Sequence, residues 1–157
     1  FYDRKEQGIV ADYVSMMGYD EHFAGGEAGS VSSINYVKNG IARMLENVPR
    51  EKLIGGVPFY TRLWTEAGDG TITSKAMGIA EEKRWVDNNQ VELTWQADTA
   101  QYYGEVQTSD GAQFLWMEEE RSLKEKMNVI RQNDLAGVAC WKLGFEDSAA
   151  WDSIQWN

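Results

Sequence analysis

The chain has 157 residues, of which 43% are hydrophobic and 25% are charged, as in ordinary soluble globular proteins. Its formal net charge is −10 and no run of basic residues occurs, which argues against nucleic acid and against an anionic membrane surface as partners. No apolar stretch reaches the roughly 18 residues of a membrane span, and a single cysteine, Cys140, excludes an internal disulfide.

The first predicted strand is the apolar run from about Tyr13 to Met17. Residues 1–12 before it predict the tail of a helix that stops at Gly8, followed by a short link. The strand ends at Gly18, and polar or titratable groups follow from Tyr19 to His22. A buried parallel strand that delivers side chains to a ligand site ends in this way.

A helix and a second strand follow. Apolar residues at helical spacing predict an amphipathic helix from about Ser30 to Asn47, with Ser30 as its N-cap and Pro49 after its end. The second strand spans Leu53 to Tyr60. A strand, a helix and a strand in this order form a βαβ unit, which places two parallel strands in one sheet.

The pattern changes between Thr61 and about Met117. Thr73 to Asn88 predicts a helix, and Ser109 to Gly111 predicts a hairpin turn. Three runs of alternating polarity predict antiparallel strands: Val91 to Trp95, Tyr102 to Val106 and Ala112 to Trp116. This part therefore reads as a small α+β insertion.

The parallel pattern returns in the last 40 residues or so. Ser122 and Glu125 have the spacing of a capping box and open a helix that runs to about Asn133. The third strand spans Leu135 to Leu143, and a loop and a short helix end the chain. Three parallel strands alone would leave exposed sheet edges. The predicted fold is therefore α/β: three consecutive units of a larger α/β barrel, with an insertion after the middle strand.

Three motifs in this order resemble glycoside hydrolase family 18, the chitinase-like (β/α)8 TIM barrels. Met17 to Asp20 is similar to the family's M-x-Y-D motif at the end of the sixth strand. Lys52 to Trp64 is similar to K-[LI]-x-x-G-x-P-x-Y-G-R-x-W of the seventh strand, with Thr61 in place of a glycine. Gly137 to Trp141 resembles the eighth strand. Tyr19 to His22 and Trp141 to Glu146 look most like bacterial members, including enzymes of spore or cell-wall peptidoglycan.

The resemblance implies the C-terminal portion of such a barrel. Residues 1–64 would hold strands six and seven, residues 65–117 a chitinase-type insertion, and residues 118–157 the seventh helix and the eighth strand. The family's D-x-x-D-x-D-x-E signature, which carries the general acid on the fourth strand, does not occur in this sequence. Strands one to five are therefore expected upstream of these residues.

The resemblance also implies the chemistry. Family 18 enzymes cleave β-1,4 bonds next to N-acetylglucosamine by substrate assistance, in which the acetamido oxygen attacks the anomeric carbon. The catalytic positions it assigns are Tyr19, whose hydroxyl would hold the acetamido group, and Asp20, which would bind the sugar beside it. A phenol suits this task because it donates a hydrogen bond while it stays neutral at pH 7.

Four further positions are expected to bind substrate. Trp141 would form the apolar floor beneath the sugar, and Met17 would line the acetamido pocket unless it is a core methionine. Tyr60 and Arg62 would end the seventh strand of the barrel, and Arg62 could bind a sugar hydroxyl or pair with a carboxylate instead. Trp64, Trp95 and Trp116 are expected in the core, with a groove wall as the alternative.

Other reactive side chains have simpler interpretations. His22 has no second histidine or cysteine at ligand spacing, so neither a metal site nor a cofactor is expected. Glu146 and Asp147 could line a cleft or be solvated loop acids. Cys140 lies in an apolar strand, which favours an inert core thiol.

These observations predict the C-terminal fragment of a glycosidase that hydrolyses N-acetylglucosamine-containing glycans, either chitin or peptidoglycan. Its partners would be such a glycan and the missing N-terminal half of the barrel, and the fragment alone is expected to be inactive. The alternatives are a lectin-like barrel that binds N-acetyl sugars and a free-standing α+β interaction domain. Family resemblance implies an extracellular, cell-wall or spore-associated location.

Overall fold

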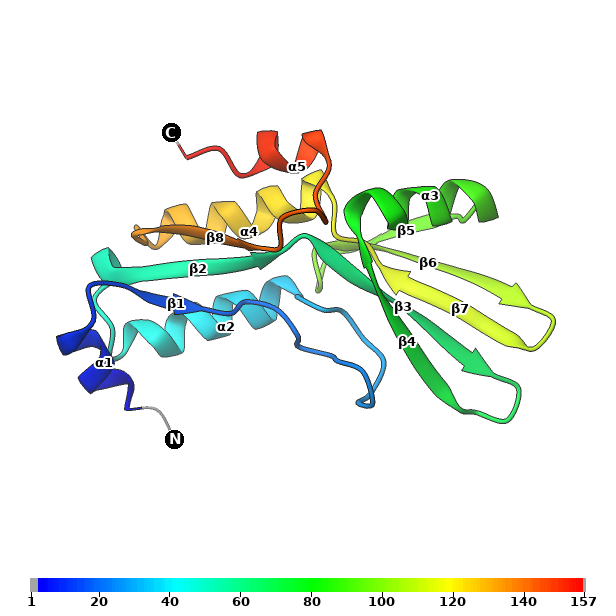
Figure 1. Cartoon of the computed structure of the whole chain (residues 1–157), viewed down its shortest axis with the longest axis horizontal. Coiled ribbons are helices and arrows are strands. Elements are labelled where there is room, and N and C mark those ends of the chain that lie inside the picture. Colours follow the sequence, from blue (N-terminus) through cyan, green and yellow to red (C-terminus); the bar gives the residue numbers. More distant parts are fainter. Residues whose placement is uncertain (1–2, 157) are drawn as a thin grey trace.

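The computed structural model describes residues 3–156 as two sheets placed one after the other along the long axis of the molecule (Figure 1). Residues 1–2, where the predicted first segment begins, lie outside the described part. The elements are, in order, α1 (Arg4–Val10), β1 (Val14–Met16), α2 (Ile34–Leu45), the 3-10 turn η1 (Arg50–Lys52), β2 (Leu53–Pro58), β3 (Tyr60–Ala67), β4 (Ile72–Gly78), α3 (Ile79–Asn89), β5 (Leu93–Gln96), β6 (Gln101–Thr108), β7 (Gly111–Trp116), α4 (Glu120–Gln132), β8 (Gly137–Trp141) and α5 (Ser148–Ser153).

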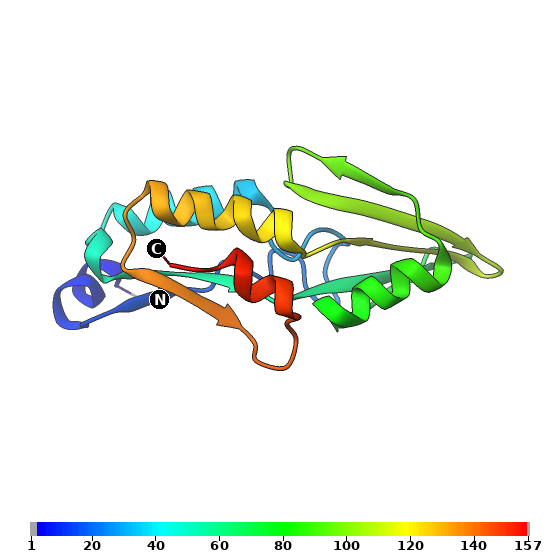
Figure 2. The same cartoon turned by 90° about the horizontal axis from the view of Figure 1, so that it is seen from above.

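The first sheet confirms the predicted α/β pattern. Its order is β1-β2-β8 and both pairings are parallel, with Met16 opposite Gly55 and Pro58 opposite Trp141. Helices α2 and α4 lie together against one face of this sheet (Figure 2). The main core lies at that contact and includes Ile41, Leu53 and Ile130, all fully buried. Burial of apolar surface on this one face therefore holds the three strands and two helices together.

The opposite face of the first sheet is open in the described structure. Ser15 of β1 and Ala139 and Trp141 of β8 are exposed there. Parallel sheets are normally covered on both faces. This sheet accordingly presents its strand ends and Trp141 on an accessible surface.

The second sheet is antiparallel, with the order β4-β3-β7-β6-β5. Helix α3 covers one of its faces (Figure 1). The helix predicted over Thr73 to Asn88 is wrong in its first part, because β4 continues to Gly78 and α3 begins at Ile79. Residues 72–78 form a strand because they pair with β3 along their whole length, with Trp64 opposite Ser74. This tertiary contact overrides the local helical pattern.

Helix ends also differ from the sequence prediction. The capping box exists, but Glu119 is the N-cap of α4 and Ser122 is the third helical residue, so the helix starts three residues earlier. Ser33, not Ser30, caps α2 and accepts the backbone N–H of Tyr36. Gly8 lies inside α1 and does not end it. None of the described helices is long and apolar enough to cross a membrane.

Gly18 permits a close approach of two chain segments where the site begins. Its N–H donates to the carbonyl of Gly56 at 3.1 Å, and a Cβ at position 18 would lie 2.3 Å from that oxygen. We expect Gly18→Ala to lower the free energy of unfolding by about 1–3 kcal/mol, because the backbone must move to relieve the clash. Chemical denaturation measures this loss. Gly137→Ala is the matched control, since that Cβ would meet open space, and equal losses in both variants would contradict the assignment.

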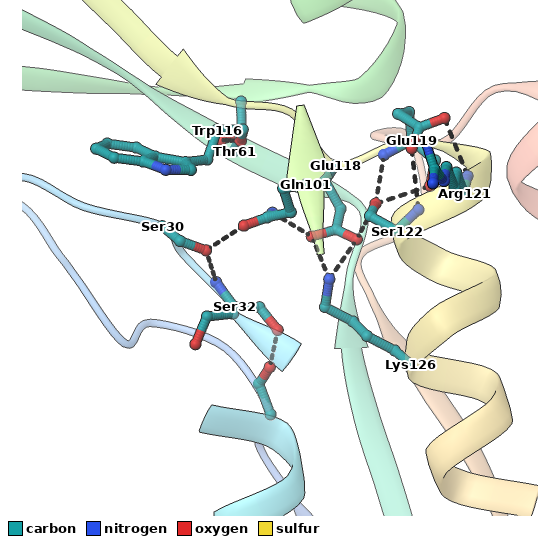
Figure 3. Close-up of polar contacts among 12 residues, drawn as sticks. Ser30, Ser32, Thr61, Gln101, Trp116, Glu118, Glu119, Arg121, Ser122 and Lys126 are labelled. Atoms are coloured by element: carbon teal, nitrogen blue, oxygen red, sulfur yellow. Dashed lines mark hydrogen bonds and ion pairs between the residues drawn. The ribbon is translucent and has the colours of Figure 1, made fainter. Parts of the chain in front are cut away.

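A buried polar network links helix α4 to β6 of the second sheet and to the segment before α2 (Figure 3). Lys126 of α4 donates to both carboxylate oxygens of Glu118, at 2.9 and 3.0 Å, and both side chains are fully buried. Ser122 and Gln101 also donate to this carboxylate, at 2.8 and 3.1 Å. Gln101 accepts in turn from the hydroxyl of Ser30. Burial raises the pKa of Glu118, and the adjacent Lys126 opposes that rise. The charge is therefore paired and hydrogen-bonded, as a buried charge must be.

Glu82 is a second fully buried acid, on α3. One of its oxygens accepts the N–H of Glu118 at 3.2 Å, and the other has no hydrogen-bond partner among the described residues. Burial raises the pKa of Glu82 well above its usual value, although the hydrogen bond from the Glu118 N–H opposes that rise. The folded protein therefore keeps a proton on Glu82 at a pH where the unfolded chain has lost it.

This proton makes stability depend on pH. Above the ordinary glutamate pKa of 4.5, Glu82 loses its proton in the unfolded chain but keeps it in the folded protein. The free energy of unfolding therefore falls as the pH rises, until the pH reaches the pKa of the folded state. We expect Glu82→Gln to be more favourable relative to wild type at pH 8 than at pH 5, with a limiting slope of about 1.4 kcal/mol per pH unit. Urea unfolding at both pH values measures the difference. The same pH response in Glu81→Gln, an exposed neighbour, would contradict this account.

Candidate functional site

The candidate site lies at the carboxyl ends of β1, β2 and β8. Parallel pairing brings these ends to one edge of the sheet. Tyr19 and Asp20 follow β1, Tyr60 lies two residues beyond the end of β2, and Trp141 is the last residue of β8. Four of the six predicted site residues therefore come together from three separate parts of the chain.

Tyr60 and Asp20 are joined directly, because the Tyr60 hydroxyl donates to Oδ1 of Asp20. Burial raises the pKa of Tyr60, and this hydrogen bond raises it further. The phenol therefore remains a neutral donor throughout the physiological range, and it fixes the orientation of the carboxylate. A carboxylate held by one oxygen retains acceptor capacity on the other.

Tyr19 lies between two aromatic rings. Its ring is stacked against Trp141, with centroids 6.4 Å apart, and meets the Tyr60 ring edge-on at 6.3 Å. Burial and the nearby Asp20 carboxylate raise the pKa of Tyr19. Its hydroxyl is therefore also a neutral donor, on a ring that its neighbours orient.

Trp141 combines a fixed backbone with an accessible ring. Its carbonyl accepts the N–H of Phe59 at 2.7 Å, and the peptide bond that follows it, to Lys142, is cis. The residue is 53% exposed. A large flat apolar surface held in this way can stack on the apolar face of a ligand ring.

Asp20 has an unusual backbone conformation, with φ of +59°. A residue other than glycine in this left-handed region costs on the order of 1 kcal/mol, and the surrounding structure must maintain it. Glu21 supplies part of that restraint: its N–H donates to Val31 at 2.9 Å, and its carboxylate accepts the backbone N–H and the hydroxyl of Ser33. The loop that carries Asp20 is therefore tied to the start of α2.

Arg62 and Met17 are placed differently from the other four. Arg62 lies on β3 and donates to the Ser74 hydroxyl at 3.1 Å, while its buried Nε has no partner among the described residues. Met17 is 69% exposed. It lines a hollow of about 470 Å³ at the open edge of β1, together with Tyr36 and Arg43 of α2.

The remaining candidates have structural contacts. His22 bonds the carbonyl of Ser30 through Nδ1 at 2.8 Å. Glu146 accepts the N–H of Gly144, and Asp147 caps α5 and pairs with Lys83. No group of three or more His, Cys, Asp or Glu side chains suitable for a metal ion occurs within residues 3–156. Burial raises the pKa of Cys140 to about 11, so its thiol stays protonated at neutral pH.

The tryptophans of the second sheet differ in burial, because Trp64 is a core residue whereas Trp95 and Trp116 are half-buried. Trp116 also lines a hollow together with His22 and Ser30. Trp64 is fully buried and donates to the carbonyl of Gly29 at 2.9 Å, as expected of a core residue. Trp116 donates to Gln96 at 2.8 Å. Trp95 lies under the guanidinium of Arg121, 3.6 Å from the ring centre, which is a cation–π contact.

Sequence reasoning missed the residues that hold the site in place. Glu21 and Ser33 are 12 residues apart and belong to no local motif. Ser32 donates its hydroxyl to the carbonyl of Gly18 at 2.6 Å, which restrains the segment just before Tyr19. The cluster of serines at positions 30, 32 and 33 was the available signal, because serines before a helix bond to nearby backbone groups.

Comparison with known proteins gives a consistent family. The sequence model described as glycosyl hydrolases family 18 matches residues 2–146. A Bacillus subtilis glycosylase, YvbX, is 29% identical over 155 residues, which are 98% of this chain and 44% of that protein. The cortical fragment-lytic enzyme of Bacillus subtilis is 26% identical over 152 residues, or 96% of this chain and 35% of the enzyme.

Solved structures share the fold. A chitinase from Chromobacterium violaceum superimposes with a TM-score of 0.89 at 23% identity, over 98% of this chain and 47% of that one. At this identity the likeness concerns the fold. The chain spans less than half the length of these relatives.

Proposed function

Because this chain belongs to the glycosyl hydrolases of family 18, we propose that it is the C-terminal part of a glycosidase that hydrolyses N-acetylglucosamine-containing glycans. In this proposal residues 1–64 and 118–157 hold strands six to eight of a (β/α)8 barrel, and residues 65–117 form an insertion. The sheet of the insertion begins within the first segment, because β3 starts at Tyr60. The remaining strands would pair with the edges of β1 and β8 and cover the open face of the first sheet. Exposed Tyr13 and Met17 beside β1 support such a contact.

The observation that carries the proposal is the arrangement of Tyr19, Asp20, Tyr60 and Trp141. Two neutral phenols and an oriented carboxylate lie next to an exposed indole ring. Sugar recognition uses these groups, because a ring face stacks on an aromatic plane while directed donors and acceptors bind its substituents. Tyr19 would hold the acetamido group, Asp20 would bind beside it, and Trp141 would form the floor.

Substrate assistance makes these positioning groups part of the reaction. The acetamido oxygen of the substrate acts as nucleophile, so the protein must hold it against the anomeric carbon and stabilise the charge that develops. Tyr19 and Asp20 would do both. The general acid would come from strands beyond these 157 residues, and this chain alone would bind the glycan without cleaving it.

The names of the relatives indicate two different substrates. The cortical fragment-lytic enzyme points to peptidoglycan of the spore cortex, and the structural neighbour is a chitinase. Both glycans contain β-1,4-linked N-acetylglucosamine. We propose this shared unit as the ligand, with a spore-associated or extracellular place of action.

Calorimetric titration tests the proposal. The chain should bind a tetramer of N-acetylglucosamine and not a glucose tetramer with the same linkage, which lacks the acetamido groups. Prolonged incubation should leave the N-acetylglucosamine tetramer intact. Equal binding of both tetramers would contradict the acetamido site, and release of shorter sugars would contradict the missing general acid.

A further inference from the structure

A continuous hydrogen-bonded path leads from the buried ion pair to the candidate site (Figure 3). Gln101 of β6 donates to Glu118 at 3.1 Å and accepts from the Ser30 hydroxyl. The same Ser30 oxygen accepts the N–H of Ser32 at 3.0 Å. The Ser32 hydroxyl then donates to the carbonyl of Gly18 at 2.6 Å. The path ends on the peptide group that leads into Tyr19.

This path is shielded from water along its length. Gln101, Glu118 and Ser32 are fully buried, and Ser30 is 3% exposed. A polar group that loses its partner in such a place costs about 1–3 kcal/mol, so each member strongly favours one position. Bonds in a region of low dielectric also reinforce one another. The network is therefore a stiff connection and not a set of solvated contacts.

The network restrains the segment that carries Asp20. Asp20 has a left-handed backbone that must be maintained from both sides. Glu21 is tied to Val31 and Ser33 on one side, and Gly18 is tied to Ser32 on the other. The side before Asp20 is thus held by the network, through Ser32, as well as by the hydrogen bond between Gly18 and Gly56.

We propose that Gln101 is a positioning residue for the candidate site: it transmits the fixed position of the Glu118–Lys126 pair to the segment that carries Tyr19 and Asp20. The second sheet then contributes to the site in two ways: Tyr60, the first residue of β3, contacts Asp20 directly, and Gln101 of β6 acts through the network. The positioning of Tyr19 and Asp20 by Gln101 does not depend on any ligand. Its expected effect on sugar binding rests on the proposed function.

The decisive experiment reads the placement directly. In the Gln101→Met variant we expect the ¹H–¹⁵N amide resonances of Tyr19, Asp20 and Glu21 to shift from their wild-type positions. Gln113→Met is the matched control, because Gln113 of β7 bonds only Thr65 within the described residues, at 3.3 Å. Its resonances at the site should stay in place. Ser30→Ala, which removes one hydroxyl and leaves the Glu118–Lys126 pair intact, is the milder second variant should Gln101→Met fail to fold.

Sugar binding gives the second measurement. We expect Gln101→Met or Ser30→Ala to weaken binding of the N-acetylglucosamine tetramer about tenfold, at a temperature where both variants are fully folded. Gln113→Met should bind as wild type does. A purely structural role would lower the melting temperature without this loss of affinity, and that result would overturn the proposal.

The outcomes separate this inference from the proposed function. Unmoved site resonances in folded Gln101→Met and Ser30→Ala would refute the positioning role, whether or not the wild type binds sugar. Shifted resonances in the two variants, together with a wild type that binds no sugar, would refute the proposed function and uphold the positioning of Asp20. Shifted resonances together with weakened binding would support both.

Discussion

Replacing Lys126 by methionine is expected to lower the free energy of unfolding by about 3–5 kcal/mol, because Glu118 would remain as an unpaired buried acid. Both side chains are fully buried and 2.9 Å apart. In a domain of this size the loss corresponds to a fall in melting temperature on the order of 10 °C. Thermal and urea unfolding at pH 7 measure it.

Two variants make this result specific. Lys124→Met removes an exposed lysine from the same helix, where Lys124 and Glu120 are 3.8 Å apart, and it should cost less than about 0.5 kcal/mol. The double variant Glu118→Gln, Lys126→Met removes both charges and should recover part of the loss. A loss in Lys126→Met no larger than in Lys124→Met would show that the buried pair does not stabilise the fold.

Replacing Trp141 by alanine is expected to weaken binding of the N-acetylglucosamine tetramer roughly thirtyfold. Stacking one sugar face would bury on the order of 80 Å² of the indole, which at about 25 cal/mol per Å² contributes about 2 kcal/mol. Because Trp141 is 53% exposed but packs against Tyr19, the variant should also lose some stability, so its affinity is measured at a temperature where it is fully folded. Calorimetric titration of the variant measures the affinity.

Trp156 provides the matched control, since it is 48% exposed and lies near the end of the described chain. Trp156→Ala should bind the tetramer as the wild type does. Equal affinity losses in the two variants would mean that the sugar does not stack on Trp141.

The parallel sheet was predictable because each strand has a local signal. The apolar runs before Gly18, through Leu53 and through Cys140 each form a strand close to where the pattern places it. The segment from Ile72 to Gly78 had no such signal. Its residues do not alternate clearly, and four of the seven are exposed, so the partner strand β3 decides its conformation.

The site was predictable to the same extent. Tyr19 and Asp20 follow β1, and Tyr60 follows β2 as the first residue of β3. Trp141 ends β8, so the parallel order of β1, β2 and β8 brings the four side chains to one edge of the sheet. The bond between Tyr60 and Asp20 spans 40 residues, and that between Ser30 and Gln101 spans 71. Contacts of this separation depend on how the two sheets meet, which no local pattern encodes. The supporting network therefore became visible only in three dimensions.

In the proposed complex an N-acetyl sugar lies on Trp141 with its acetamido group at Tyr19. Intermolecular nuclear Overhauser effects between the tetramer and the chain detect this arrangement. We expect contacts from the acetamido methyl protons to the rings of both Tyr19 and Trp141. Contacts confined to other aromatic residues, such as Tyr103 or Trp156, would contradict the account.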